Sequence, residues 1–541
     1  MAVKVVTIKN WHRGMSDVDI DDYSLPGQAS YIQHADIIES QPFLRPNFAV
    51  ESEESGLNTG ANGKIGRVRA YATRYAGIDT TKIYAFDYGD DTGTPRIGVF
   101  EKDSFADTAW SDIDSFTDAQ ATTEPPANAV FWKGDRYAFF ADHAAGANSL
   151  SIGIFDSNGG ASATTTHDLI NDANWGGPSS GIIKRFLNHT DGETYVLVWN
   201  ATNGQGYMGV YVDASSKFNS GIPVAMPAGY EPEDFISYGN KILVLANSSR
   251  GETSTIFIRD PYQSLVYTFD DFYNIKINRV VAMRIVKGRV IIISCDFDYK
   301  IWEWTGGDNV NLLKVLPVND YNSLFNVRPE AVDVKDGILY FGTACGVSGF
   351  NNGVYAFGFN DDGSTFLYNV MTDDENDTSN IEYRALKWYD DETSVGMFVT
   401  SLDVTNSTYN NMEYVIGASR TANLDWRSTW IRPFLQKSQL IQVDLFHEAA
   451  SAGTISLYQE TDAADPITWD ATNLRFTALC TSSYLTRYGN NGVKRGTLNA
   501  AGTAFTGGRK HKIRVTMTSG AQLEKIKLTF RTQDRDRYGT L

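Results

Sequence analysis

The sequence predicts an all-β protein: an extended N-terminal arm, a seven-bladed β-propeller and a C-terminal β-sandwich. The first observation is a three-strand unit that recurs seven times, with central strands beginning at Lys82, Arg136, Thr194, Lys241, Arg289, Ile338 and Val395. A repeat of about 50 residues made of strands is typical of a propeller. The second is the lack of any long segment with helical apolar periodicity. The third is a change in the sign of the net charge near residue 430, which indicates a domain boundary.

Each unit follows one order: an opening strand, a tight turn, a central strand, a variable loop and a third strand. The turns carry dipeptides such as Asp191-Gly192 and Asp336-Gly337, residue types that supply the positive φ angles of hairpins. Central strands such as KILVLAN, from Lys241, are almost continuously apolar, as expected for strands covered on both faces. A weaker fourth strand, for instance from Asn311, follows several units. A long sandwich with accidental spacing is the alternative, and the recurrence of one unit favours the propeller.

Three domains are predicted: residues 1–65 as arm and linker, 66–429 as the propeller, and 430–541 as a jelly-roll-like sandwich. The last segment contains strands such as GTISLYQETD, from Gly453, that alternate apolar and polar residues. Residues 1–429 carry 32 Lys and Arg against 56 Asp and Glu, a net charge of −24. Residues 430–541 carry 15 against 9, a net charge of +6. The acidic body argues against nucleic-acid binding, which needs a basic face.

The cysteines and the N-terminus restrict the cellular context. Cys295, Cys345 and Cys480 are far apart and form no CxxC pair, so neither a disulfide framework nor a zinc ribbon is indicated. The N-terminal apolar run is short and is interrupted by Lys4, which is unlike a signal peptide. The sequence also has no apolar stretch long enough to span a bilayer. We therefore expect a soluble protein without a membrane anchor, not exported by the general secretory route.

Motifs for catalysis or cofactor binding are scarce. The seven His residues show no metal-binding spacing, and no nucleophile elbow, Walker loop or dinucleotide-binding glycine pattern is present. We predict no catalytic, cofactor-binding or metal-binding residues. Asp17–Asp22 alternates carboxylates as a calcium loop does, but Asp22 replaces the required glycine and Gln28 the final glutamate. An exposed acidic turn is the preferred interpretation, and cation binding there stays open.

One short segment, Asp361–Phe366, resembles the Asp-box of sialidase-type propellers. Asp361, Gly363 and Thr365 match that box, whereas Phe366 replaces its tryptophan. The box is a turn element and not a catalytic one, so it predicts a hairpin only. A propeller glycosidase would need paired carboxylates in the central channel, and the sequence singles out no such pair. An enzyme is therefore not the preferred interpretation.

Two groups of residues are candidates for surface contacts. Trp175 lies in a Gly-rich loop and is the best candidate for an exposed aromatic contact, whereas Trp132, Trp302 and Trp304 are expected to pack between blades. The other group is the basic C-terminal set, which begins with Arg509, Lys510, Lys512 and Arg514 and continues with Lys525, Lys527, Arg531, Arg535 and Arg537. Two readings of this set stay open: the solvated face of two strands, or a surface that docks onto an acidic partner.

The layout of the whole chain carries a resemblance. A leading strand runs into WHRGMSDVDIDDYSLPG, then QHADIIES and QPFLRPN, then the propeller, and finally a sandwich ending in LEKIKLTFR. This resembles the propeller-containing tail proteins of tailed bacteriophages, of the nozzle and tail-tip type. The resemblance implies a viral structural protein that is a virion component of the tail, made in the host cytoplasm and used in host attachment or genome delivery. It also implies a homo-oligomeric ring, contacts with neighbouring tail proteins and no enzymatic activity.

Two other functions stay open at this point. One is a propeller that binds a host-surface glycan or receptor, and the other is a propeller glycoside hydrolase. Ring stoichiometry, position along the tail, host and receptor do not follow from the sequence.

Overall fold

The computed structural model describes most of the predicted strands. The described residues are 2–9, 11, 29–33, 35–36, 44–46, 50–52, 68–77, 80–91, 94–102, 110–117, 128–132, 137–142, 151–156, 181–201, 203–212, 217–218, 223–251, 253–262, 268–296, 298–316, 327–345, 353–372, 381–391, 394–404, 408–416, 424–434, 437–449, 453–462, 469, 474–480, 484–489, 505, 507–518 and 520–532. Across these ranges the secondary structure is almost entirely β-strand, with a 3₁₀ turn at Pro329–Ala331 and no α-helix.

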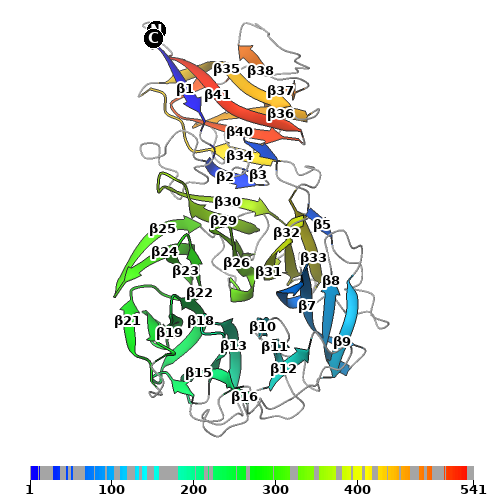
Figure 1. Cartoon of the computed structure of the whole chain (residues 1–541). Helices are drawn as coiled ribbons and strands as arrows, with labels where there is room; N and C mark the ends of the chain where they lie inside the picture. The colour runs from blue at the N-terminus through cyan, green and yellow to red at the C-terminus, as the bar shows by residue number, and fades with distance from the viewer. Residues whose placement is uncertain are drawn as a thin grey trace. The chain divides into compact units, whose positions relative to one another are not determined.

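The chain divides into two compact units. The first comprises residues 1–50, 355–372 and 417–541, and the second comprises residues 51–354 and 373–416. We call the second the ring unit, because its sheets are arranged around a centre (Figure 1). We call the first the two-sheet unit.

The ring unit contains the predicted repeats as separate antiparallel sheets. The first sheet contains β6 (Val68–Gly77), β7 (Thr80–Asp91), β8 (Thr94–Lys102) and β9 (Ser111–Thr117), and the second contains β10 (Val130–Trp132), β11 (Tyr137–Asp142) and β12 (Ser151–Asp156). The third contains β13 (Gly181–Asn188), β14 (Thr194–Asn200) and β15 (Gln205–Val212), with β16 (Lys217–Phe218) and β17 (Val224–Ala225) beside β15. The fourth contains β18 (Tyr230–Tyr238), β19 (Lys241–Ser248), β20 (Ser254–Arg259) and β21 (Asp271–Ile275), and the fifth contains β22 (Val280–Val286), β23 (Arg289–Asp296), β24 (Asp298–Gly306) and β25 (Asn309–Leu316).

Two further sheets complete the series of repeats, and the residues 355–372 that end the first of them belong to the two-sheet unit. One orders β26 (Val332–Lys335), β27 (Ile338–Gly342), β29 (Val354–Phe359) and β30 (Thr365–Met371); the other orders β28 (Ala344–Cys345), β31 (Ile381–Asp391), β32 (Ser394–Asp403), β33 (Thr408–Val415) and β5 (Val50–Ser52). Every central strand that the repeat predicted is a strand in the structure. The fourth strand predicted from Asn311 is β25.

The sheets close into a ring through their opening strands. Each of β6, β10, β13, β18, β22, β26 and β31 contacts the next, and β31 contacts β6. At this closure Tyr71 and Phe398 lie in one apolar cluster with Trp110 and Tyr389, and the Tyr71 hydroxyl is 2.7 Å from the Thr400 hydroxyl. The strand β5, from near the start of the unit, pairs in the last sheet. A cyclic set of antiparallel sheets is a β-propeller, and this contradicts the alternative of a long sandwich for the repeats.

The hairpins between opening and central strands are set by local sequence. Lys287 and Gly288 have φ angles of 47° and 78°, and Asp336 and Gly337 have 53° and 72°. Positive φ at both central residues defines the tight turn that matches the twist of the flanking strands. The central strand β23 that follows is buried from Val290 to Cys295, so both of its faces are covered.

The two-sheet unit is built from strands at both ends of the chain. One sheet orders β1 (Val3–Ile8), β41 (Ala521–Thr532), β35 (Ser438–Ala449) and β38 (Tyr484–Gly489), with β39 (Gly507–Gly508) beside β35. The other orders β2 (Ala29–Gln33), β34 (Leu424–Ser428), β40 (His511–Met517), β36 (Gly453–Thr461) and β37 (Leu474–Cys480). A short pair, β3 (Ala35–Asp36) and β4 (Arg45–Pro46), is also present.

Alternating burial gives each sheet one inner face. In β40 the buried residues alternate with the partly exposed ones, and so does most of β41. His511 of β40 lies with its ring centroid 4.8 Å from that of Phe530 in β41, so inner faces of the two sheets meet. The strand predicted from Gly453 forms as β36.

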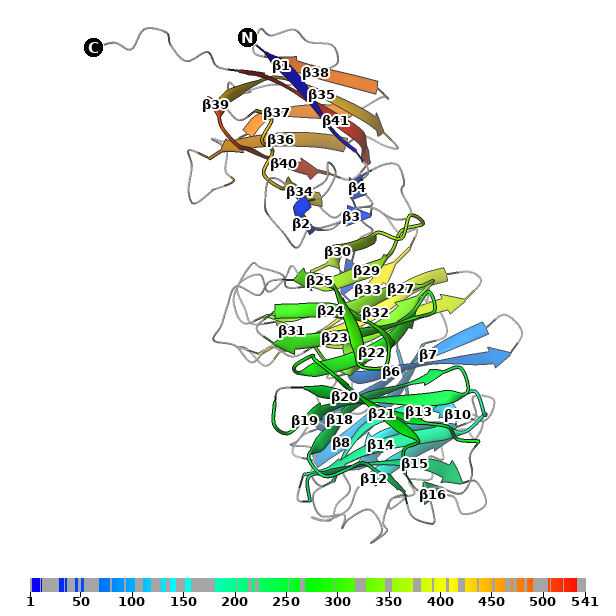
Figure 2. The ribbon, with the colours of Figure 1, turned by 90° about the vertical axis from the view of Figure 1, so that its left-hand side faces the viewer.

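Two strands of the predicted N-terminal arm, β1 and β2, pair with strands from beyond residue 420. β1 pairs along its whole length with β41, from Val3 opposite Arg531 to Ile8 opposite Ile526, and Figure 2 shows the two strands side by side. The Trp11 indole donates a hydrogen bond to the Glu524 carbonyl at 2.8 Å. The reason is that β41 needs a partner on its outer edge, and an alternating strand satisfies it. The unit boundaries therefore differ from the predicted ranges 1–65, 66–429 and 430–541.

Candidate functional site

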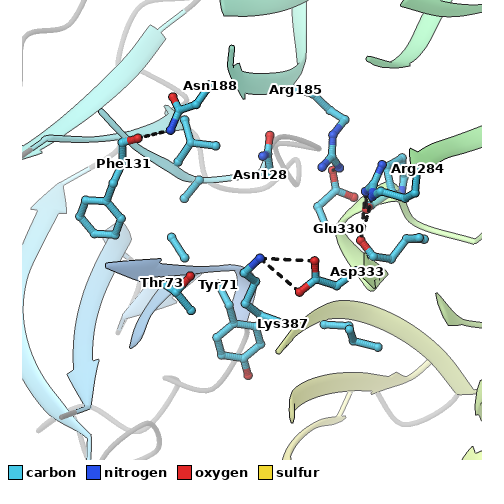
Figure 3. A pocket seen from close by; sticks show the side chains of 16 residues that line it. Tyr71, Thr73, Asn128, Phe131, Arg185, Asn188, Arg284, Glu330, Asp333 and Lys387 are labelled. Carbon is cyan, nitrogen blue, oxygen red and sulfur yellow. Dashed lines mark hydrogen bonds and ion pairs between the residues drawn. The ribbon is translucent and has the colours of Figure 1, made fainter. Parts of the chain in front are cut away.

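A polar pocket lies among the opening strands of the ring unit. Its volume is about 230 Å³, and its wall comes from β6, β10, β13, β22, β26 and β31, with the turn at Pro329–Ala331. Figure 3 shows charged side chains from several of these strands pointing toward one another at this pocket. The pocket exists because opening strands converge at the centre of a propeller, where side chains of different sheets meet.

Asp234 is the centre of the charged network beside this pocket. Its side chain is fully buried and forms an ion pair with Arg185 Nε at 2.9 Å and a second ion pair with Arg284. The same carboxylate accepts backbone hydrogen bonds from Phe235 at 2.9 Å and Met283 at 2.8 Å. A buried carboxylate with this number of donors is well compensated, so Asp234 is a structural group and is not available to a ligand.

Arg284 likewise makes several hydrogen bonds within the protein. Its guanidinium donates to the Met283 and Pro329 carbonyls, both at 2.7 Å, and to the Val332 carbonyl at 3.0 Å. Because these carbonyls belong to two neighbouring sheets, Arg284 fixes one opening strand against the next.

Arg185 and Glu330 differ from these residues because they form an ion pair with each other in which neither atom makes a hydrogen bond. Arg185 Nη1 and Glu330 Oε1 are 3.6 Å apart, beyond hydrogen-bond length, and both atoms are buried without a hydrogen bond. The side chains are 11% and 7% exposed, and both line the pocket. Burial raises the pKa of Glu330 and lowers that of Arg185, because it penalises the charged form of each.

Asp333 and Lys387 form another part of the wall. Lys387 Nζ lies 3.2 Å from Asp333, whose carboxylate also accepts the Trp388 backbone N–H at 2.9 Å. Two other polar side chains, Asn128 and Asp234, accept a backbone N–H from a neighbouring sheet in the same way as Asp333. The Asn128 side chain accepts the Phe186 N–H at 2.7 Å, just as Asp234 accepts that of Met283. These three contacts tie the opening strand of one sheet to that of the next.

The arrangement is suited to binding and not to two-carboxylate chemistry. Glycoside hydrolysis needs two available carboxyl groups, whereas Asp234 and Asp333 are both held by cations and backbone donors. Among the residues that the structure describes, no cluster of three or more His, Cys, Asp or Glu could hold a metal ion. In the same residues, no helix is both long and apolar enough to cross a membrane.

Several predicted residues lie outside the described part of the chain or pack as structural groups. Trp175 and the acidic segment Asp17–Asp22 lie outside the described residues. Trp302 and Trp304 are partly buried against the core of β18–β24, as expected for packing between blades. The side chain of Trp132 is not described.

The segment that resembles an Asp-box forms the predicted hairpin. It connects β29 and β30, and Gly363 at its tip has a φ of 81°. Asp362 accepts the Ser364 backbone N–H at 2.9 Å, which closes the turn. The segment therefore acts as a turn element.

The predicted basic surface is divided between two sheets. Lys512 and Arg514 are on β40, whereas Lys525 and Lys527 are on β41 in the other sheet. Arg514 is bound to Asp425 at 3.0 Å, so part of the set has a structural role. The remaining members have these positions: Arg509 and Arg531 are exposed, Lys510 is partly exposed, and Arg535 and Arg537 lie outside the described residues.

The pocket residues were missed by the sequence analysis, although a signal was present. Most of them sit in the opening strands of the repeats, which the sequence identified only as strands, whereas Glu330 lies in the 3₁₀ turn. A charged residue inside a short apolar strand is unusual, since burial requires a partner. Arg185, Arg284 and Asp333 all show this pattern.

Comparisons with known proteins give the fold only. No protein-family model and no curated protein matches the chain. Among solved structures, the Dos1 propeller is similar with a TM-score of 0.41 and 11% identity, covering 68% of this chain and 94% of its own. The Pseudomonas aeruginosa periplasmic gluconolactonase has a TM-score of 0.31 and 13% identity, covering 68% and 92%. The Trypanosoma rangeli sialidase has a TM-score of 0.32 and 9% identity, covering 88% and 95%.

Proposed function

We propose that this chain is a structural component of a tailed-phage virion, a seven-bladed propeller with a jelly-roll-like sandwich that forms part of the tail used in host attachment or genome delivery. The proposal begins from the layout of the sequence and places the protein in the virion tail after synthesis in the host cytoplasm. The protein acts as a scaffold and not as an enzyme. Its partners are further copies of itself and neighbouring tail proteins.

The opposed charge of the two parts of the chain carries the proposal. Residues 1–429 have a net charge of −24 and residues 430–541 of +6. Complementary charges on different parts of one chain favour contacts between unlike surfaces of neighbouring copies, and such contacts generate rings when the rotation closes. The closed propeller adds rigidity, because its sheets leave only short edges unpaired.

The contact between copies differs from the one that a free arm would make. Since β1 pairs with β41 in the same chain, it is not available as an arm to a neighbour. The exposed Arg509 and the partly exposed Lys510, next to the start of β40, are better placed to meet an acidic surface of another copy.

Gold-labelled antibodies against the chain test the function in purified particles of the phage whose genome encodes it. Label at the tail is expected in electron micrographs. Label on the capsid, or particles that contain none of the protein by mass spectrometry, would show that the proposal is wrong.

Sedimentation of the purified full chain tests the self-association. The double variant Arg509→Glu and Lys510→Glu is expected to associate more weakly than the natural chain, and salt should weaken association in the natural chain too. Arg289→Glu, a charge reversal on an exposed side chain of the ring unit, is the matched control. If both variants behave alike, the basic residues do not form the contact.

A glycan- or receptor-binding propeller is the second candidate function. The observation that favours it is the polar pocket among the opening strands of the ring unit, which is lined by charged side chains of several sheets.

A further inference from the structure

We propose that the free edge of β1 pairs with β1 of a second copy of this chain, so that two antiparallel edge strands join two sheets into one across a two-fold axis. The inference goes beyond the proposed tail role and does not rest on it, because two copies can pair in this way inside or outside a virion. It also rests on a different observation from the charge difference that carries that role.

In the described part of the chain, β1 has a strand partner on one edge only. It is the end strand of the order β1-β41-β35-β38, and each of its residues from Val3 to Ile8 is paired with β41. Figure 1 shows β1 beside β41 at the margin of this sheet. The other edge of such a strand is a row of N–H and C=O groups to which a further strand can bond.

The backbone groups of Val3, Val5 and Thr7 point to this free edge. The Thr532 N–H donates to the Ala2 carbonyl at 3.0 Å, so Ala2 faces β41. Backbone direction alternates along an antiparallel strand, and the register of β1 with β41 runs without a shift. Every second residue after Ala2 therefore bonds to β41, and the residues between them offer their N–H and C=O to a further strand.

The same edge leaves apolar side chains exposed. Val3 is 60% exposed and Val5 is 53% exposed. Both lie on the outer face of the sheet, since Val3 is opposite the exposed Arg531, whereas Ile8 on the other face is buried. Free edges are commonly protected by proline, by a bulge or by several charges. β1 has neither proline nor a bulge, and Lys4 is its one charged residue, so it is suited to pairing.

A second copy of β1 fits this edge completely. In an antiparallel pair centred on Val5, this residue lies opposite Val5 of the second copy and Val3 lies opposite Thr7. The three outward residues then form hydrogen-bonded pairs with about six hydrogen bonds in total. The exposed valines of the two copies meet on one face. The contact is self-complementary, as a two-fold interface requires.

The charged residue of β1 selects this register over its neighbours. A register centred on Lys4 would place the two Lys4 side chains directly opposite each other, and like charges in that position are unfavourable. A register centred on Val6 would leave Val3 without a partner. The pair centred on Val5 avoids both problems.

Electrostatics distinguishes this contact from the one proposed for Arg509 and Lys510. The part of β41 beside β1 carries Lys527 and Arg531, and each chain has a net charge of −18. A two-fold contact brings like charges of two copies toward each other, whereas Arg509 and Lys510 would meet an acidic surface. Salt screens both interactions, so it should strengthen pairing through β1 and weaken the other contact.

Sedimentation velocity of the full chain carrying Arg509→Glu and Lys510→Glu tests the proposal. This double variant lacks the basic residues of the other contact and keeps β1 unchanged. One strand edge gives a small interface and a weak complex, so the concentration series extends to about 1 mM. A monomer–dimer equilibrium that shifts toward the dimer with added salt is expected.

Two substitutions at the centre of the pair locate the contact. Val5→Pro removes an N–H that points to the free edge, and proline is tolerated at such a position of an edge strand. Val5→Asp keeps the N–H and places two carboxylates opposite each other in the dimer. Each change, made in the double variant, is expected to raise the Kd of the dimer at least about tenfold while Tm stays close to its value before the change. Val404→Asp, the same change at a valine of the ring unit that is 49% exposed, is the matched control.

Cross-linking tests the register directly. Val5→Cys places two thiols at facing positions of a hydrogen-bonded pair, whose Cα atoms are about 5.5 Å apart, so a short bismaleimide should join two chains. Val404→Cys should give no such product. The chain with its three natural cysteines is the blank.

The outcomes decide the proposal. A dimer that the Val5 variants lose and Val404→Asp retains supports it, and Val5→Asp with the cross-link decides the matter if Val5→Pro fails to fold. A monomer at every concentration, a dimer that survives Val5→Asp, or association in the double variant that weakens with salt would overturn it. The tail role is tested separately by antibody labelling, so failure of one proposal is distinguishable from failure of the other.

Discussion

The ring unit and the two-sheet unit bury polar groups in different ways. The ring unit buries charges: Asp234 with Arg185 and Arg284, and Lys102 with Glu413 at 2.5 Å beside the Phe398 ring. The two-sheet unit buries several neutral polar groups, such as His511 between Ser438 and Gln459 and the Trp11 indole on Trp426, as well as the ion pair of Asp425 with Arg514.

Geometry explains this difference. Two sheets stacked face to face enclose alternating side chains, and an apolar interior is the simplest filling. In a propeller, the opening strands of different sheets meet edge to edge around a wet centre, so their backbone donors and acceptors need polar side-chain partners. Buried ion pairs therefore join neighbouring sheets in the ring unit, in addition to apolar clusters such as the one at the ring closure. Four predictions follow this comparison from the largest effect to the smallest.

Asp234→Asn should break the ring unit most strongly. It leaves two buried guanidinium groups without their carboxylate, and removing one partner of a buried ion pair costs about 3–5 kcal/mol of unfolding free energy. Urea unfolding followed by tryptophan fluorescence measures the loss. Glu303→Gln, whose partner Arg289 is 45% exposed, should cost under about 1 kcal/mol. Equal losses in the two variants would show that burial does not govern these ion pairs.

The two-sheet unit should lose stability in acid through His511. Burial lowers the pKa of this side chain from 6.5 to about 4. The unfolded chain then binds more protons between these values, so the stabilising contribution is complete above about pH 6.5 and declines as pH falls toward about 4. The loss is of the order of 3 kcal/mol.

Comparison of the natural chain with His511→Gln at neutral and acidic pH measures this effect. The variant should show a weaker decline in unfolding free energy with falling pH. The same decline in both proteins would assign the acid sensitivity to other groups.

Trp11→Phe should reveal how firmly the N-terminal segment is held. The indole N–H donates to the Glu524 carbonyl and the ring packs on Trp426 at 5.2 Å. Losing this buried hydrogen bond and part of the ring contact should cost about 2 kcal/mol. Trp304→Phe also loses a hydrogen bond, to the Gly307 carbonyl at 2.7 Å, but that ring is partly exposed, so its cost should be smaller. A larger loss of unfolding free energy for Trp304→Phe than for Trp11→Phe would show that the Trp11 contacts do not hold the N-terminal segment firmly.

Asp362→Ala should have the smallest effect. The Asp362 carboxylate closes an exposed turn by accepting the Ser364 N–H, and water can replace it, so a cost of about 0.5 kcal/mol is expected. Denaturant unfolding should detect a small shift in midpoint. A loss comparable to that of Asp234→Asn would mean that the turn has a role beyond closing the hairpin.

The sequence was informative wherever a local pattern decides the structure. The buried strand β23 and the Lys287-Gly288 turn could be predicted from the sequence because strand burial and positive φ depend on neighbours in the chain. The pairing of β1 with β41 was not predictable, since it joins residues at opposite ends of the chain. The pocket was missed for the same reason: Arg185 and Glu330 become partners only when the ring closes.

By itself, then, the sequence determined that this protein is built from recurring strands with tight turns and that its charge is opposite in its two parts. The tertiary structure decided which opening strands lie side by side, that the N-terminal strand pairs with β41, and which buried charges are compensated. The physical reason is range: strand and turn preferences act over a few residues, whereas ion pairs and sheet edges are matched between segments far apart in the chain.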